Sequence, residues 1–434
     1  MKILGISPLD KDATASIVED GEILFAAGEE RFSRNKQQDG FPLQAIQNAL
    51  SYTNTKVEEI DMVVYAFMES KDELNLIDNN LQKERDFLKT FKRTNIKPLL
   101  LEAEKKIPRR HEHIYGLSLP NEKMEKSFLY DTFYNLAGSQ AAISSKAGIK
   151  GSRNWADQAR ASFNSYQDEL ETGLEQIGLG GKLKRIDHHL THAANSYYAS
   201  GYTKALCITL DGYGTGLAGS VSQAIGGKIK RLHGIEYPNS LGTLYEHVTS
   251  SLGFKPSRHE GKIVGLASYG DPDILTPILL SRIEQTDGDF KIFEANNVYF
   301  SRYLASHFPK IDVAAAYQNV LEVVATNFVK YWVKKTGIDT VVLSGGVTAN
   351  VKLNQRIFEI EGVNNIFVYP NMGDGGCGTG AALYHSQTEE RKPTISNAYF
   401  GPDFSDDEIA KELKEAGLEF TKPDHLATEV DGLI

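Results

Sequence analysis

Cysteine is nearly absent from this chain of 434 residues, which contains only Cys207 and Cys377. Two cysteines do not make the disulfide framework of a small secreted domain, so we expect a reducing, cytoplasmic compartment. Apolar runs are short, and none approaches the roughly 18 residues of a membrane span. Basic residues are outnumbered by acidic ones, and the net charge of -10 argues against a broad nucleic-acid surface. A small basic pocket for a phosphate remains compatible with this charge.

The strand pattern begins at the N-terminus and recurs in the second half of the chain. A single core rarely grows to this length, so we expect two or three lobes. The first lobe begins with three strands, a helix and a further strand, predicted at residues 2–7, 14–18, 22–27, 41–50 and 62–67. The same opening of three strands recurs at residues 205–211, 217–225 and 228–236. This order is that of a ribonuclease-H-like unit.

Two such units predict an α/β protein with the actin-like ATPase (ASKHA) superfold, two ribonuclease-H-like halves at residues 1–69 and 186–386. Residues 70–185 are charged with apolar residues at helical spacing, which predicts a helical insertion acting as a lid or as a homodimer surface. The glycine-punctuated segment 261–270 predicts a loop. Residues 387–434 read as a linker and the start of a C-terminal domain. The apolar stripe of their last helix lacks cover, which suggests a truncated chain or a partner.

Two histidines four residues apart are the strongest chemical signal. His188 and His192 would share one face of a helix, where both imidazoles can bind one cation. A bare pair with this spacing is more often a structural pair in the core. Here Asp211 ends the next strand and Asp374 lies in a glycine-rich turn before a helix. Two imidazoles and two carboxylates suit a divalent metal such as Fe, Mn or Zn, whereas calcium prefers more oxygen ligands.

Glycine-rich turns provide candidate nucleotide contacts. Gly345 and Gly346 follow a buried strand and precede a helix with Asn350, so bare backbone there can approach a phosphate. A plain strand-to-helix turn is an equally good reading of this segment, and the P-loop pattern is missing. Further candidates for the nucleotide are Gly212, Glu260 and Lys262, although the last two would also suit a surface loop. Lys36 lies in a charged run that is alternatively a solvated turn.

Several segments, in this order along the chain, resemble the O-carbamoyltransferases of antibiotic and nodulation-factor biosynthesis. The resemblance covers nearly the whole chain except about 70–180. The tRNA threonylcarbamoyl-transferase subunit shares the superfold and the metal histidines, but not the Glu-Glu-Arg-Phe segment. The segments that carry the resemblance are Ile3-Leu4-Gly5-Ile6-Ser7, Gly28-Glu29-Glu30-Arg31-Phe32-Ser33-Arg34, His188-His189-Leu190-Thr191-His192-Ala193, Leu210-Asp211-Gly212, Gly265-Leu266-Ala267-Ser268-Tyr269-Gly270, Ser344-Gly345-Gly346-Val347, Gly373-Asp374-Gly375-Gly376 and Gly401-Pro402-Asp403-Phe404-Ser405.

The resemblance implies two domains and a two-step reaction. A C-terminal YrdC-like domain makes carbamoyl-adenylate from carbamoyl phosphate and ATP. The actin-like domain then moves the carbamoyl group to a hydroxyl of an acceptor, beside a bound ferrous ion. The implied site has three parts: the iron ligands His188, His192, Asp211 and Asp374, the nucleotide contacts Gly345, Gly346 and Asn350, and Lys36 near the carbamoyl-adenylate.

Two departures from the family pattern matter. The resemblance makes Lys11, Asp12 and Lys36 the candidate catalytic residues. Lys11, just before Asp12, stands where the family usually has a histidine that is a candidate general base. A lysine is a poor base at neutral pH, so either the site lowers its pKa, another group takes the proton, or transfer is lost. The chain also stops about where the YrdC-like domain should begin, so alone it should not make carbamoyl-adenylate.

Three hypotheses follow. The first is a carbamoyltransferase that uses a separate YrdC-like domain or protein. The second is a catalytically idle module that binds metal and nucleotide and docks a partner through the insertion. The third is a small-molecule kinase, which the histidine pair argues against because such kinases hold Mg²⁺ mainly through carboxylates and phosphates.

Overall fold

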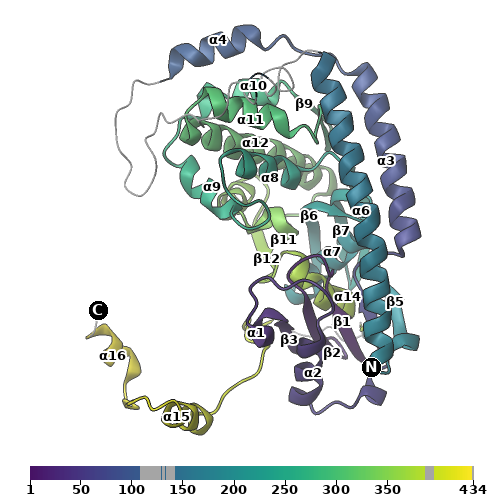
Figure 1. Ribbon diagram of the computed structural model, residues 1–434, viewed down its shortest axis with the longest axis vertical. Coiled ribbons are helices and arrows are strands. Elements are labelled where there is room, and N and C mark those ends of the chain that lie inside the picture. Colours follow the sequence, from purple (N-terminus) through teal and green to yellow (C-terminus); the bar gives the residue numbers. More distant parts are fainter. Residues whose placement is uncertain (108–128, 130–131, 133–141, 387–394, 433–434) are drawn as a thin grey trace.

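Two five-stranded mixed sheets form the centre of the chain (Figure 1). The computed structural model describes residues 1–107, 129, 132, 142–386 and 395–432. In the first sheet the strand order is β3-β2-β1-β4-β5. Strand β2 is antiparallel to β1 and β3, whereas β4 is parallel to both β1 and β5. The strands are β1 (Lys2–Ile6), β2 (Thr14–Glu19), β3 (Glu22–Gly28), β4 (Met62–Tyr65) and β5 (Leu183–Arg185).

The second sheet repeats this topology. Its strand order is β12-β11-β6-β7-β8, with β7 antiparallel to β6 and β8, and β11 parallel to β6 and β12. The strands are β6 (Lys204–Gly214), β7 (Leu217–Ile225), β8 (Lys228–Glu236), β11 (Thr340–Ser344) and β12 (Asn365–Val368). The same ribonuclease-H-like order occurs twice, so the predicted actin-like superfold is confirmed.

Two helices lie between the sheets and connect the halves. Helix α7 (His188–Ala199) follows β5 but packs on β6 and β11, whereas α14 (Cys377–His385) follows β12 but packs on β1, β2 and α7. Their small side chains share one apolar cluster with residues of both sheets. Gly378 allows α14 to approach β1 closely, since a Cβ there would lie 2.7 Å from the carbonyl carbon of Ile6. This exchange brings the C-terminal end of β12 beside the start of α7.

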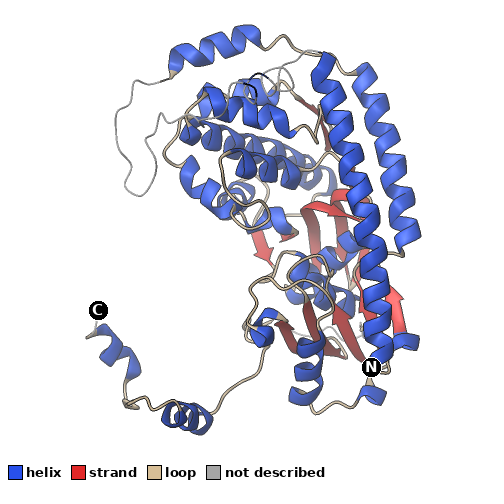
Figure 2. Cartoon of the chain, viewed as in Figure 1, coloured by secondary structure: helices blue, strands red, loops and turns tan. Residues whose placement is uncertain are grey.

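The insertion runs along one side of both sheets as a pair of long helices (Figures 1 and 2). Helices α3 (Ser70–Thr90) and α6 (Ala142–Gln176) pack together, and α4 (Lys97–Lys106) follows α3. The buried carboxylate of Glu84 on α3 accepts a hydrogen bond from Ser152 on α6. The short strand β5 falls within residues 70–185 of the sequence assignment, yet it pairs with the first sheet, so that sheet extends beyond residue 69.

Helices cover the second sheet, and one of them lies where the sequence predicted a loop. Helix α9 occupies most of the segment predicted as a loop at 261–270, and that prediction was wrong. Ile263 and Leu266, three residues apart, are buried, and the helix packs on α12, so burial outweighs the low helix propensity of glycine. The elements here are α8 (Leu241–Ser251), α9 (Glu260–Ala267), α10 (Thr276–Leu280), β9 (Ile283–Thr286), β10 (Asp289–Ile292), α11 (Val298–His307), α12 (Lys310–Thr336) and α13 (Val351–Phe358).

The remaining elements are short. The N-terminal half also has α1 (Glu30–Ser33) and α2 (Leu43–Tyr52). The 3-10 helices of the described residues are η1 (Val57–Glu59), η2 (Gly180–Lys182), η3 (Pro272–Ile274), η4 (Gly346–Ala349) and η5 (Asp374–Gly376). The C-terminal segment with α15 (Asp406–Glu415) and α16 (Leu426–Asp431) extends away from the sheets in Figure 1. Leu433 and Ile434 of the predicted apolar stripe lie outside the described residues. No helix in the described parts is long and apolar enough to cross a membrane.

Candidate metal centre and active-site cleft

The start of α7 places two imidazoles side by side. Asp187 caps this helix, and its side chain accepts a hydrogen bond from the backbone N–H of Leu190 at 2.8 Å. His188 and His192 therefore lie on one face of the helix, and both are fully buried. Their Nε2 atoms are 3.1 Å apart. His189 points elsewhere, and its Nδ1 lies 2.9 Å from the Thr209 hydroxyl.

Asp211 brings a carboxylate to both imidazoles. Its Oδ2 lies 3.2 Å from Nε2 of His188 and 3.0 Å from Nε2 of His192. The other oxygen, Oδ1, accepts hydrogen bonds from the backbone N–H groups of Gly212 at 2.8 Å and Gly346 at 3.2 Å. These two amides fix the carboxylate, leaving Oδ2 directed at the histidines.

Asp374, in η5, supplies the second carboxylate from a turn 163 residues further along. Its Oδ1 lies 3.5 Å and 3.7 Å from Nε2 of His188 and His192. This side chain is only 9% exposed, and Oδ1 has no hydrogen-bond partner among the described residues. Its Oδ2 lies 3.4 Å from Nζ of Lys11. A buried carboxylate oxygen without a donor is costly unless a cation approaches it.

Cys377 is the residue that the sequence analysis missed. It is fully buried at the start of α14, and its Sγ lies 3.3 Å from Nε2 of His192. Ligand atoms of His188, His192, Asp374 and Cys377 all lie within 4.8 Å of one another. One available signal was the position of this cysteine, three residues after Asp374 in the same glycine-rich turn.

The spacing of these atoms fits a metal ion. A cation with bonds of about 2.1 Å to nitrogen or oxygen separates neighbouring ligand atoms by about 3.0 Å in octahedral and about 3.4 Å in tetrahedral geometry. The Nε2 and Oδ2 atoms of His188, His192 and Asp211 are 3.0–3.2 Å apart, and Oδ1 of Asp374 is 3.5–3.7 Å from the two imidazoles. This buried His/His/Asp/Cys cluster, with Asp211 beside it, can therefore bind a metal.

A hydroxyl group orients one of the imidazoles. Ser344 donates its hydroxyl hydrogen to the carbonyl oxygen of Met372 at 3.1 Å, so its Oγ accepts from Nδ1 of His192 at 2.9 Å. The proton of neutral His192 then sits on Nδ1, and the Nε2 lone pair faces the cluster. The ring of His188 is held differently, stacked on Phe67 at a centroid distance of 4.8 Å.

The electrostatics of the cluster attract positive charge. Burial acts to lower the pKa of His188, but the neighbouring Cys377 and the hydrogen bond with Asp211 outweigh it and raise the pKa to about 9. Burial likewise acts to raise the pKa of Asp211, yet its contacts with His188 and His192 hold that pKa well below the usual value. His189 behaves in the opposite way, because burial lowers its pKa to about 3. A metal ion would supply the positive charge that protons otherwise bring.

The surroundings of Lys11 favour its charged form. The ion pair with Asp374 raises its pKa well above the usual lysine value, although burial acts against this. Of the alternatives raised by the sequence, the one in which the site lowers the pKa of Lys11 does not fit. Asp12 adopts a positive φ of 48° next to it, and burial raises the pKa of this carboxyl.

A cleft of about 480 Å³ opens over the two carboxylates. Its lining includes basic and aromatic side chains as well as carboxylates. The basic residues are Lys11 and, from the α8–α9 loop, Lys255 and Arg258, and the aromatic residues are Tyr65, Phe67, Trp155, Phe163, Tyr166, Tyr213 and Tyr237. Trp155, Phe163 and Tyr166 come from α6, so the insertion forms one wall of the cleft. Such a size and mixture are typical of a small-molecule site.

The predicted site residues divide into two groups. Lys11, Asp211, Gly212 and Asp374 line the cleft, with His188 and His192 next to the carboxylates. The lining does not include Asp12, Lys36, Glu260, Lys262, Gly345, Gly346 and Asn350. Lys36 is largely exposed and pairs with Glu30 at 3.2 Å. The roles predicted for Lys36 and for all the other site residues stay predictions.

In the turn at Gly345 and Gly346, which was predicted to contact a nucleotide, both backbone N–H groups already donate hydrogen bonds within the protein. Gly345 adopts a φ of 98°, and a Cβ there would lie 2.3 Å from the carbonyl oxygen of Leu210, so glycine is required. Its N–H donates to the carbonyl oxygen of Met372 at 2.7 Å, and that of Gly346 donates to Asp211. Asn350 caps α13 and donates to Gln318 at 2.8 Å. In this arrangement the turn supports Asp211 directly.

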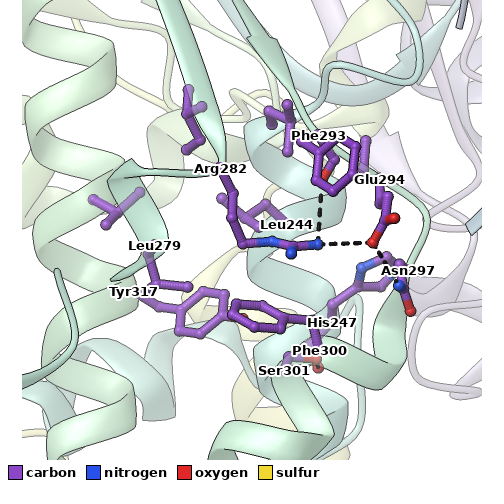
Figure 3. A pocket seen from close by; sticks show the side chains of 14 residues that line it. Leu244, His247, Leu279, Arg282, Phe293, Glu294, Asn297, Phe300, Ser301 and Tyr317 are labelled. Carbon is purple, nitrogen blue, oxygen red and sulfur yellow. Dashed lines mark hydrogen bonds and ion pairs between the residues drawn. The ribbon is translucent and has the colours of Figure 1, made fainter. Parts of the chain in front are cut away.

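A second cavity lies away from the cluster and is too small for a substrate. It measures about 30 Å³, enough for a water molecule or two. Figure 3 shows Arg282 directed at the carboxylate of Glu294, at 3.0 Å, with Asn297 on the other side of that carboxylate. Glu294 also accepts a hydrogen bond from Ser145 of α6 at 2.8 Å. This buried group attaches the insertion to the second half of the chain.

Comparisons with known proteins find similar proteins over most of the chain. The family model described as "Carbamoyltransferase N-terminus" matches residues 2–383. The nodulation protein NolNO of Sinorhizobium fredii is 26% identical over 96% of this chain and 53% of its own length. An uncharacterized protein of Synechocystis is 27% identical over 95% of this chain and 62% of its own length. Among solved structures, HypF of T. kodakarensis is similar with a TM-score of 0.43 and 12% identity, over 90% of this chain and 49% of its own.

The chain therefore spans between about half and three fifths of these two curated relatives, 53% of one and 62% of the other. The family model extends from β1 into α14, which includes both sheets, the insertion and every residue of the candidate metal cluster. By this match, the chain belongs to the carbamoyltransferase N-terminal family.

Proposed function

We propose that this chain is the transferase part of an O-carbamoyltransferase, which moves a carbamoyl group from carbamoyl-adenylate to a hydroxyl of a small-molecule acceptor. The observation that carries the proposal is the cluster of His188, His192, Asp211 and Asp374 beneath a cleft of about 480 Å³. Family membership supports the reaction class. The donor would be made from carbamoyl phosphate and ATP by a YrdC-like domain or protein.

The cleft offers groups for each chemical part of the reaction. The acceptor oxygen bonds to the carbamoyl carbon, the bond between that carbon and the adenylate phosphate oxygen breaks, and AMP leaves. The charges of Lys11, Lys255 and Arg258 suit the anionic donor and the leaving phosphate. The hydroxyl proton passes to a carboxylate of the lining, for which Asp10 and Glu246 are the candidates. Lys11, being protonated, would stabilise negative charge.

The metal would be Fe²⁺ by the resemblance, held by His188, His192, Asp211 and Asp374. When bound, a divalent ion acts as a Lewis acid on a carbonyl or phosphoryl oxygen. The aromatic wall suits an acceptor with a flat, partly apolar ring, because aromatic side chains pack against such faces and exclude water. Sugars, polyketides, cephems and nucleosides are the classes of hydroxyl acceptor to be tested.

Acceptor-dependent release of AMP tests the proposal. The metal-loaded chain is mixed with carbamoyl phosphate, ATP, a purified YrdC-like domain and a panel of ring alcohols. We expect AMP release with at least one acceptor, and its loss in His192→Ala. His189→Asn is the matched control, since His189 is equally buried on the same helix but contacts Thr209 instead of the cluster. Equal loss in both folded variants would contradict the proposal.

A second candidate is a catalytically idle module that binds metal and nucleotide for a partner. One observation favours it: the ion pair with Asp374 raises the pKa of Lys11, which stands where the family usually has a histidine that is a candidate general base. Stoichiometric binding of metal and adenylate, with no AMP release for any acceptor, would support this reading. Release in Lys11→His alone would show that the natural chain has lost transfer.

A further inference from the structure

Cys377 brings sulfur to a cluster that otherwise offers nitrogen and oxygen. A buried cysteine alone is usually an inert packing residue. Here a second, independent feature marks the same point as a ligand site, because the 9% exposed side chain of Asp374 directs Oδ1 at the cluster without a hydrogen-bond partner among the described residues. Sγ and Oδ1 therefore converge, with His188 and His192, on one small volume.

The distances suit direct coordination by sulfur. A metal–sulfur bond of about 2.3 Å and a metal–nitrogen bond of about 2.1 Å separate the two ligand atoms by about 3.1 Å in octahedral and about 3.6 Å in tetrahedral geometry. The observed separation of Sγ of Cys377 and Nε2 of His192 is 3.3 Å.

We propose that Cys377 is a ligand of the metal ion at this cluster, and that its thiolate makes the site selective for Fe²⁺, Co²⁺ or Zn²⁺ over Mn²⁺ and Mg²⁺. Soft sulfur ligands favour the first group, whereas sites of carboxylate and water favour the second. On binding, the thiol proton passes to solvent as the metal–sulfur bond forms. The inference rests on the metal site of the proposed function, and it holds equally for the idle module.

Cobalt substitution tests the sulfur ligand without any activity measurement. The metal-free protein is titrated with Co²⁺, and its absorption is recorded in the visible region for ligand-field bands and in the near ultraviolet for thiolate-to-cobalt charge transfer. We expect both in the wild type. Cys377→Ser and Cys377→Ala should keep the visible bands and lose the charge-transfer band. Cys207→Ser is the control, because Cys207 is equally buried in β6 and is the other cysteine of the chain.

Competition between metals gives a second readout. We expect the preference for Zn²⁺ over Mn²⁺ to fall by at least about tenfold in Cys377→Ser, and to stay unchanged in Cys207→Ser. Visible bands without charge transfer in the wild type would overturn the sulfur ligand while leaving the metal site of the proposed function intact. Failure of the folded wild type to bind Co²⁺ or Zn²⁺ at all would overturn both.

Discussion

Ser344 offers a sharp test of how the chain prepares its metal site. Its hydroxyl donates to the carbonyl oxygen of Met372 and accepts from Nδ1 of His192, which directs Nε2 into the cluster. In Ser344→Ala the Met372 oxygen still accepts from the N–H of Gly345 at 2.7 Å. The imidazole of His192 is therefore the group that loses its partner, and both its tautomer and its orientation become free.

The expected effect is on metal affinity. Removing a group that orients a ligating histidine typically lowers affinity 10- to 100-fold, which corresponds to about 1.4–2.7 kcal/mol. We expect a loss in this range for Ser344→Ala when Zn²⁺ is titrated against a chromophoric chelator. Part of the free energy of unfolding should also be lost, on the order of 1–3 kcal/mol, because a buried donor is left unpaired.

The matched control is Ser220→Ala. Ser220 is fully buried like Ser344, but it bonds Thr209 at 2.9 Å, on the side of His189. Its loss should affect stability and leave metal affinity within about twofold of the wild type, since Thr209 is no member of the cluster. An unchanged affinity in Ser344→Ala, or an equal loss in both variants, would refute the reasoning that Ser344 positions His192.

Three further predictions concern pH, packing and charge. Burial raises the pKa of Glu84 from 4.5 to about 7, so the folded chain keeps a proton that the unfolded chain loses. The free energy of unfolding should therefore fall by about 3 kcal/mol as the pH rises through this window. Glu84→Gln should abolish that part of the pH dependence of the free energy of unfolding, as measured by urea unfolding. Gly378→Ala should lower the free energy of unfolding by about 1–3 kcal/mol, because its Cβ would lie 2.7 Å from the backbone of β1. Gly261→Ala is the control: its Cβ would lie in open space on a helix, so thermal unfolding should show no change or a gain in stability. Lys11→Gln should raise KM for the anionic donor about tenfold or more, while metal affinity rises because Asp374 loses a competing cation; unchanged values of both would contradict this role.

Much of the fold follows from local patterns in the sequence. The strands at 217–225 and 228–236 have the bounds that were predicted, because alternating side chains and a Gly226-Gly227 turn specify a hairpin through backbone geometry alone. The repeat of this opening in both halves is enough to indicate the superfold. Strand β5 is different, since its three residues carry no periodicity and become a strand by pairing with β4.

The metal site divides in the same way between sequence and structure. The spacing of His188 and His192 sets them on one helix face by the geometry of the helix itself. Asp211 was found as the last residue of a predicted strand, although β6 continues to Gly214. Cys377 lies 185 residues from His192, and no spacing rule joins them. They meet because α7 follows the first sheet but packs on the second, α14 follows the second sheet but packs on the first, and the two helices pack against each other.

The sequence by itself determined the class of fold, the family and the imidazole pair, because these depend on short-range periodicity and on motifs whose order can be read along the chain. Only the tertiary structure decided that sulfur joins the cluster, that Lys11 stays charged, and that aromatic residues of α6 form a wall of the cleft. The physical reason is that burial, ion pairing and pKa depend on neighbours brought together by packing, whatever their separation along the chain.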